Sequence, residues 1–193
     1  MEQLRPVVLT PLATSVLALL CERPMHPYEM YRLMIKRHED RVVKLKPGSL
    51  YHTMDRLHAA GFVVATGTER EGARPERTTY AITSAGREAL GEWVRTALAE
   101  PVNEYPRLPV ALAEAHHLPR AEVIELLRTR IARVEAGLIE DEAIAGGARA
   151  CGVPEVYVLD MDFRIETTRA ELGWLRRLVS RLENEELTWP NER

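Results

Sequence analysis

The side chains best suited to chemistry lie in residues 46–62, and they offer hydrogen bonding and positive charge. Ser49, Tyr51, His52 and Arg56 carry donors and acceptors within two turns of a predicted helix that ends at a glycine. An α-helix fits the major groove of DNA, where each base pair presents a distinct pattern of donors and acceptors. Arg56 is long enough to pair with a guanine edge or with a phosphate. The pattern therefore predicts a recognition helix that binds specific DNA sequences.

Short helices and strands around this segment must position it. A helix is expected from Pro47 up to Gly61, and its apolar residues Leu50, Met54 and Leu57 recur at the spacing of a buried stripe. Ser84 is expected to cap the helix that follows the strands. The other expected elements are helices over residues 10–22, 27–36 and 85–98 and strands over residues 62–68 and 78–83. This order is typical of a winged helix-turn-helix domain.

Basic side chains around the predicted recognition helix could hold the DNA backbone. Tyr28 begins the second helix, where N–H groups without helical partners favour a phosphate, and Lys44 and Lys46 precede the recognition helix. The loop between the two strands, the predicted wing, adds three arginines that could follow the phosphates or enter the minor groove: Arg70, Arg74 and Arg77. The net charge of −3 does not oppose this interpretation, because a DNA-binding protein needs only a basic face.

Some of these assignments have structural alternatives. Tyr28 and Tyr51 could instead pack in the core, and Arg56 could form an ion pair with Asp55 or Glu29. Asp55 would repel a phosphate, so it either faces away from DNA or accepts a hydrogen bond from a cytosine amine.

The second half of the chain predicts helices only. Residues 107–117 suit a short helix, and residues 120–146 and 155–184 show apolar residues at spacings of three and four, with glycines interrupting between them. Two long helices with narrow apolar seams must pack on each other or on a partner chain, and dimerisation is favoured over an intrachain hairpin. The residues expected to join two protomers are Ile124, Leu127, Ile131, Val134, Leu138, Ile165, Leu172, Leu175, Val179 and Leu182.

No arrangement of residues indicates catalysis or a bound metal. The chain has no P-loop, dinucleotide glycine motif or GxSxG elbow, so we expect neither enzyme activity nor a cofactor. His116 and His117 are adjacent, and adjacent side chains on a helix diverge, which argues against a shared ion. Cys21 and Cys151 form no CxxC motif, which favours a reducing cytoplasm. No apolar run approaches the ~18 residues of a membrane span, and no signal peptide is recognisable, so no membrane association is expected.

Three groups of residues in the first half occur in an order that points to a family. They are His26-Pro27-Tyr28-Glu29-Met30; Gly48-Ser49-Leu50-Tyr51 followed by Arg56-Leu57 and Gly61-Phe62-Val63; and Arg74-Pro75-Glu76-Arg77-Thr78-Thr79-Tyr80 followed by Thr83-Ser84-Ala85-Gly86. Together they resemble the PadR family of bacterial transcriptional regulators. The C-terminal half resembles, more loosely, the helical dimerisation domain of the longer PadR subfamily.

The resemblance implies a homodimeric repressor that binds an inverted repeat near promoters. In some members a phenolic acid or another hydrophobic compound releases the DNA. An aromatic residue at the place of Trp93 can line a flat pocket for aromatic ligands in PadR-like proteins. The residues expected to form such an effector pocket are Leu90, Trp93, Ala97 and Trp174. In the alternative interpretation Trp93 only anchors one domain to the other.

We therefore expect a mainly α-helical (α+β) chain. Residues 1–99 should form a winged helix-turn-helix DNA-binding domain, and residues 100–193 an all-helical dimerisation and effector domain. The predicted function is that of a cytoplasmic, ligand-responsive repressor. Two other classes remain open, a winged-helix metal or redox sensor and a protein–protein interaction module without DNA binding. The clustered lysines and the arginine-rich wing argue against the second of these.

Overall fold

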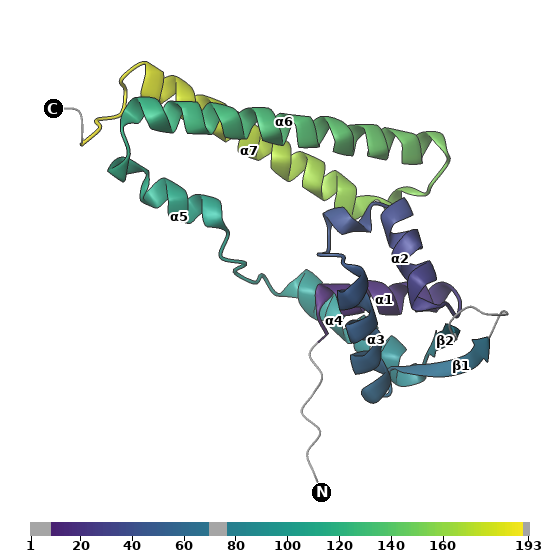
Figure 1. Cartoon of the computed structure of the whole chain (residues 1–193). Helices are drawn as coiled ribbons and strands as arrows, with labels where there is room; N and C mark the ends of the chain where they lie inside the picture. Colours follow the sequence, from purple (N-terminus) through teal and green to yellow (C-terminus); the bar gives the residue numbers. More distant parts are fainter. Residues whose placement is uncertain (1–8, 70–76, 191–193) are drawn as a thin grey trace, which may run out of the picture. The chain divides into compact units, whose positions relative to one another are not determined.

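The computed structural model describes residues 9–69 and 77–190, which are mainly helical with one small antiparallel sheet (Figure 1). The chain divides into two compact units between Asn103 and Glu104. The first unit contains α1 (Pro11–Glu22), α2 (Pro27–Lys36), the 3₁₀ turn η1 (Glu39–Arg41), α3 (Pro47–Ala59), β1 (Val63–Glu69), β2 (Arg77–Ile82) and α4 (Ser84–Ala99). This is the predicted order of a winged helix-turn-helix domain.

The first two helices begin where the sequence predicts, each with a proline in its first turn. Thr10 caps α1, because its hydroxyl accepts a hydrogen bond of 3.3 Å from the N–H of Ala13. The cap of α2 is His26, whose Nδ1 accepts a hydrogen bond of 3.0 Å from the N–H of Tyr28. The sequence pattern does not predict His26 as an N-cap, since histidine is not a common residue at that position.

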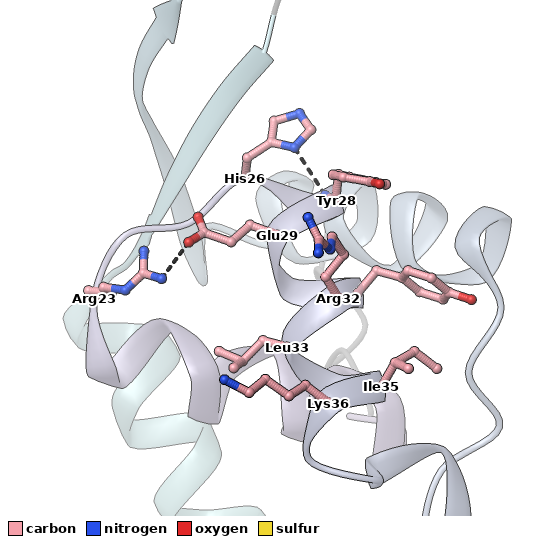
Figure 2. A pocket seen from close by; sticks show the side chains of 9 residues that line it. Arg23, His26, Tyr28, Glu29, Arg32, Leu33, Ile35 and Lys36 are labelled. Atoms are coloured by element: carbon pink, nitrogen blue, oxygen red, sulfur yellow. Dashed lines mark hydrogen bonds and ion pairs between the residues drawn. The ribbon is translucent and has the colours of Figure 1, made fainter.

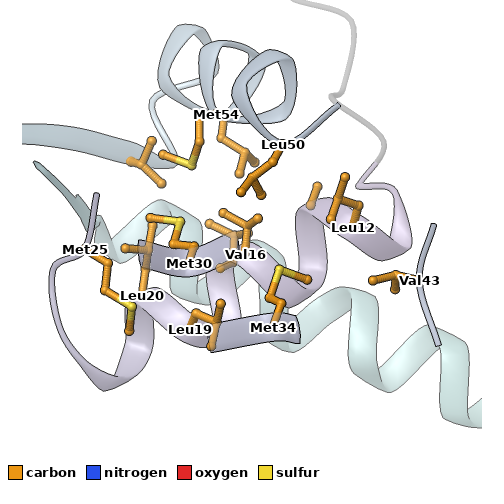
Figure 3. Packing of buried hydrophobic residues seen from close by; sticks show 14 of the residues in the cluster. Leu12, Val16, Leu19, Leu20, Met25, Met30, Met34, Val43, Leu50 and Met54 are labelled. Carbon is orange, nitrogen blue, oxygen red and sulfur yellow. The ribbon is translucent and has the colours of Figure 1, made fainter. Parts of the chain in front are cut away.

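The core of the first unit forms where three helices meet (Figure 3). The predicted buried stripe of α3 is confirmed, and it packs against buried methionines of α2 and apolar residues of α1. Fully buried side chains of this kind contribute roughly 1.5–3 kcal/mol each relative to exposed ones. Those below 2% exposure are Val16, Leu17, Leu20, Met25, Met30, Met34, Leu50, Met54 and Leu57. One side of α3 is therefore fixed in the core, which leaves the other side as a rigid outward surface.

The two strands pair in antiparallel register with one irregularity. The register shifts between Ala65 and Gly67, as in a β-bulge. Met25, in the turn between α1 and α2, forms an additional bridge to the sheet, because Met25 and Tyr80 exchange two backbone hydrogen bonds of 3.0 Å. This bridge ties the start of α2 to the base of the wing.

The junction between the sheet and α4 corrects one expectation from the sequence. The cap of α4 is Thr83 and not Ser84: the Thr83 hydroxyl accepts from the N–H of Gly86 at 3.1 Å and donates to the carbonyl of Gly61 at 2.7 Å. Gly86 permits this close approach, since a Cβ there would lie 2.2 Å from the carbonyl oxygen of Phe62. The start of α4 is thereby joined to the end of α3 and the start of β1.

The second unit is helical throughout its described part. It contains α5 (Arg107–Ala113), the 3₁₀ turn η2 (Ala115–His117), α6 (Arg120–Ala150), the 3₁₀ turn η3 (Glu155–Tyr157) and α7 (Leu159–Glu183). The expectation that Gly146-Gly147 interrupts the long helix is wrong, because α6 continues through both glycines. Buried Ala145 and half-buried Ala148 pack in a local apolar cluster there, and such tertiary packing overrides the low helix propensity of glycine. Among the described residues no helix could span a membrane.

The apolar seams of α6 and α7 pack against each other within one chain and form an intrachain helical hairpin. The apolar residues of the α7 seam are covered within the chain. Those that are buried are Ile165, Leu172, Leu175, Val179 and Leu182. Leu127 on α6 is buried with them, whereas the other α6 residues expected at a dimer interface are only half-buried: Ile124, Ile131, Val134 and Leu138. A role of this set in joining protomers stays a prediction.

Ion pairs between α6 and α7 align the antiparallel hairpin. The most buried of them joins Asp141 to Arg164 through two hydrogen bonds of 2.9 Å, and Asp141 is only 6% exposed. The more exposed pairs are Arg128–Glu183, Arg130–Glu171, Arg149–Asp162, Arg169–Glu142 and Arg176–Glu135. Exposed pairs contribute little stability each, but together they favour one register of the two helices.

Candidate nucleic-acid interface

The outward face of α3 carries the polar side chains that the sequence singles out. Ser49, His52, Asp55 and Arg56 are exposed, while the four buried residues of the helix lie on its other side. At roughly 100° per residue, His52 and Asp55 lie opposite the buried stripe, and Ser49 and Arg56 lie together along one edge. The four side chains therefore share a face that can enter a single groove.

The position of Asp55 bears on the two alternatives considered for it. Asp55 is exposed and lies beside His52 on the outward face of α3. On a helix placed in the major groove its carboxylate could accept a hydrogen bond from a cytosine amine. Asp55 thus joins the candidate base-reading residues.

Neither tyrosine packs in the core. Tyr28 is 51% exposed and Tyr51 is 45% exposed. The ring of Tyr51 stands edge-on to the ring of His26, with ring centres 6.5 Å apart and an interplanar angle of 71°. The N–H of Tyr28 donates to Nδ1 of His26, so the phenol hydroxyl is the group of Tyr28 that can reach a phosphate, and this contact stays a prediction.

The alternative ion pairs of Arg56 are not seen in the described part of the chain. Glu29 pairs with Arg23 instead, and the hydrogen bond from Arg23 lowers the pKa of Glu29 below its ordinary value. Within residues 9–69 and 77–190, Arg56 forms no ion pair, although Asp55 is its neighbour in sequence. Its guanidinium is therefore available to an external acceptor.

A groove of about 830 Å³ runs along α2 (Figure 2). Tyr28, Arg32 and Lys36 line it at helical spacings of four residues, and Glu29 in its wall is neutralised by Arg23. Arg32 and Lys36 were not predicted to contact the phosphates of DNA. Their i+4 and i+8 spacing from Tyr28 can nevertheless be read in the sequence. The groove extends the cationic surface from the start of α2 along its length.

The remaining predicted phosphate contacts are only partly described. Lys44 and Lys46 are exposed just before α3, and Lys46 occupies its N-cap position. Arg70 and Arg74 lie outside the described residues. Arg77 is the first residue of β2, and its side chain is not among those described. The contribution of the wing therefore stays a prediction.

The residues proposed for an effector pocket come from both units. Leu90 and Trp93 are half-buried and pack against the core of the first unit, whereas Ala97 is exposed further along α4. Trp174 is 44% exposed on α7 in the second unit. A pocket shared by these four residues stays a prediction.

Comparisons with known proteins agree with this geometry. Residues 16–92 match the model of the transcriptional regulator PadR-like family, a range that runs from α1 into α4. A search of curated proteins found no match.

Solved structures with similar folds include several bacterial regulators. Bacillus subtilis PadR in complex with operator DNA has a TM-score of 0.75 at 18% identity, covering 91% of this chain and 99% of that one. The same protein with p-coumaric acid has a TM-score of 0.72 at 16% identity, covering 89% and 98%. The Vibrio cholerae virulence activator AphA has a TM-score of 0.71 at 18% identity, covering 90% and 99%. At these identities the likeness establishes the fold. With the winged helix-turn-helix architecture and the match over residues 16–92, this part of the chain belongs to the PadR-like family of transcriptional regulators.

Proposed function

We propose that this regulator binds a specific operator as a homodimer in the cytoplasm and represses transcription from it. The observation that carries the proposal is the outward face of α3. Ser49, His52, Asp55 and Arg56 stand there on a helix whose opposite side is locked in the core. Exposed Lys46 at the start of the helix supplies a cation beside the polar side chains, where a phosphate would lie.

A two-fold dimer would make the operator an inverted repeat. We assign DNA binding to residues 1–99 and dimerisation to residues 100–193. Large apolar side chains outside the intrachain seam support this assignment, because Leu126, Ile139 and Phe163 are 53%, 67% and 72% exposed on α6 and α7. If both protomers bind one face of B-DNA, the half-site centres should lie about 34 Å apart or at a multiple of that distance.

We further propose that a small hydrophobic or aromatic compound releases the repressor. The similar Bacillus subtilis PadR has been solved with p-coumaric acid, which makes that compound the first to try. A ligand can shift the dimer away from DNA only if it binds the DNA-free form more tightly. Equal ligand affinity for free and DNA-bound protein would rule this step out. A promoter–reporter assay settles the direction of regulation, since the similar AphA is an activator.

The experiment that tests the proposed function is selection of bound sequences from a random DNA pool with the full chain. Affinity for the enriched sequence and for random DNA is then measured at two salt concentrations. Enrichment of an inverted repeat, bound at least about 10³-fold more tightly than random DNA, is the expected result. Weak, salt-sensitive binding without enrichment would overturn the proposal and favour a protein–protein interaction module.

A further inference from the structure

The turn between α5 and α6 places three metal-binding side-chain types together. Glu114, His116 and His117 are exposed there, and one ligand atom from each lies within 4.8 Å of the others. His116 and His117 are neighbours on the 3₁₀ turn η2, and their rings nevertheless lie close together. Their ring centres are 4.2 Å apart, with an interplanar angle of 37°.

The distances between the ligand atoms of these side chains are close to those in a metal coordination shell. Metal–nitrogen and metal–oxygen bonds to Zn²⁺ are about 2.0–2.2 Å long, so tetrahedral ligand atoms lie roughly 3.3–3.6 Å from one another. Nε2 of His117 and Oε2 of Glu114 are already 3.3 Å apart. A small rotation of exposed side chains would close the remaining difference.

The orientation of His116 also suits a ligand. Its Nδ1 lies 3.1 Å from the carbonyl oxygen of Ala113, and donation of the Nδ1 proton to that carbonyl places the lone pair on Nε2. Histidine ligands almost always donate their second ring N–H to an outer acceptor of this kind, which fixes the ring and its tautomer.

The backbone that carries the three side chains is held in place. Ala115, between the ligands, packs with Leu112 against the buried cluster of α6 and α7. After the turn, the indole N–H of Trp189 donates to the carbonyl of Leu118 at 2.8 Å. Little backbone order therefore has to be gained on binding.

We propose that Glu114, His116 and His117 form a binding site for a first-row divalent transition metal, with Zn²⁺ as the ion. Two imidazole nitrogens and one carboxylate oxygen are a donor set that Zn²⁺ accepts, and a fourth position remains for water. The site goes beyond DNA binding and does not depend on it, because all three ligands lie in the second unit. Metal bound there joins the end of α5 to η2 and stabilises the folded chain.

The test is calorimetric titration of the tag-free full chain with ZnCl₂, together with thermal melting with and without Zn²⁺. We expect one Zn²⁺ per chain and a rise in Tm. His116→Ala and His117→Ala should each weaken Zn²⁺ binding at least about tenfold, since loss of a mere outer-shell partner already costs 10–100-fold. Glu114→Gln should weaken it in the same direction and reduce the rise in Tm.

Matched controls separate this site from adventitious binding. His52→Ala and Glu122→Gln also remove an exposed histidine and an exposed glutamate, but neither belongs to the cluster, so both should bind Zn²⁺ as the parent does. Circular dichroism without metal should be unchanged in every variant. Equal Zn²⁺ affinity in His116→Ala, His117→Ala and the controls would overturn the site. Because the readout is metal binding, failure here leaves the operator proposal untouched, and failure of operator selection leaves this one untouched.

Discussion

Replacement of Arg56 by alanine tests the proposed base-reading face most directly. The guanidinium is exposed and forms no ion pair with the described residues, so its removal should leave the fold intact. One good bidentate contact to a base is worth about 1–3 kcal/mol of discrimination. At 1.4 kcal/mol per factor of ten, that is about 5–150-fold for one protomer. A homodimer loses the contact in both half-sites, so the operator affinity should fall by about 2–6 kcal/mol in total.

The measurement is a titration of labelled operator, repeated on operators substituted at each base pair and at several salt concentrations. If Arg56 reads a guanine, one symmetric pair of positions loses its sequence preference in the variant. If it contacts a phosphate, affinity falls evenly for all sequences, and the slope of log K against log salt falls by about one per lost contact. Arg87→Ala, an exposed arginine on α4, is the control and should bind as the parent does. An unchanged operator affinity for Arg56→Ala would refute the base-reading role of this face.

Three further substitutions, one of them with a matched control, test the DNA interface and the packing of each unit. Lys46→Ala should lower the salt slope by about one per protomer without changing sequence preference, and an unchanged slope removes this lysine from the interface. Gly86→Ala should cost at least about 1–3 kcal/mol in urea unfolding, because its Cβ would lie 2.2 Å from a backbone carbonyl. Gly91→Ala on the same helix has space and should gain up to about 1 kcal/mol, so equal effects at the two sites would contradict the close approach. Asp141→Ala leaves Arg164 uncompensated and should destabilise the chain by about 3–5 kcal/mol, whereas a loss below 1 kcal/mol would show that the pair is not effectively buried.

Much of the first unit follows from local rules that act along the chain. Proline in the first turn and the Thr10 cap mark the start of α1, and the spacing of Leu50, Met54 and Leu57 identifies the buried side of α3. The exposed candidates on α3 follow from the helical period, since Ser49, His52, Asp55 and Arg56 fall outside the angular range of the buried stripe. The predicted cap of α4, Ser84, is wrong by one residue, because Thr83 and Ser84 are adjacent and both are good N-cap residues. Only the hydrogen bond from Thr83 to the carbonyl of Gly61 selects Thr83.

Other features depend on partners far away in sequence. The bridge between Met25 and Tyr80 joins residues 55 positions apart, and no local sequence pattern predicts it. The closeness of the two adjacent histidine rings on η2 cannot be read from their spacing, because neighbouring side chains on a helix point in different directions.

The sequence by itself determined the order of the elements, the buried side of α3 and the polar residues on its outer side, because periodicity and capping are local properties of the chain. Only the tertiary structure decided what the apolar seams of α6 and α7 cover. A heptad seam has the same appearance whether its partner is the next helix or another chain, since burial of apolar surface carries no direction. The ion pairs between the two helices, among them the pair of buried Asp141 with half-buried Arg164, favour the intrachain hairpin.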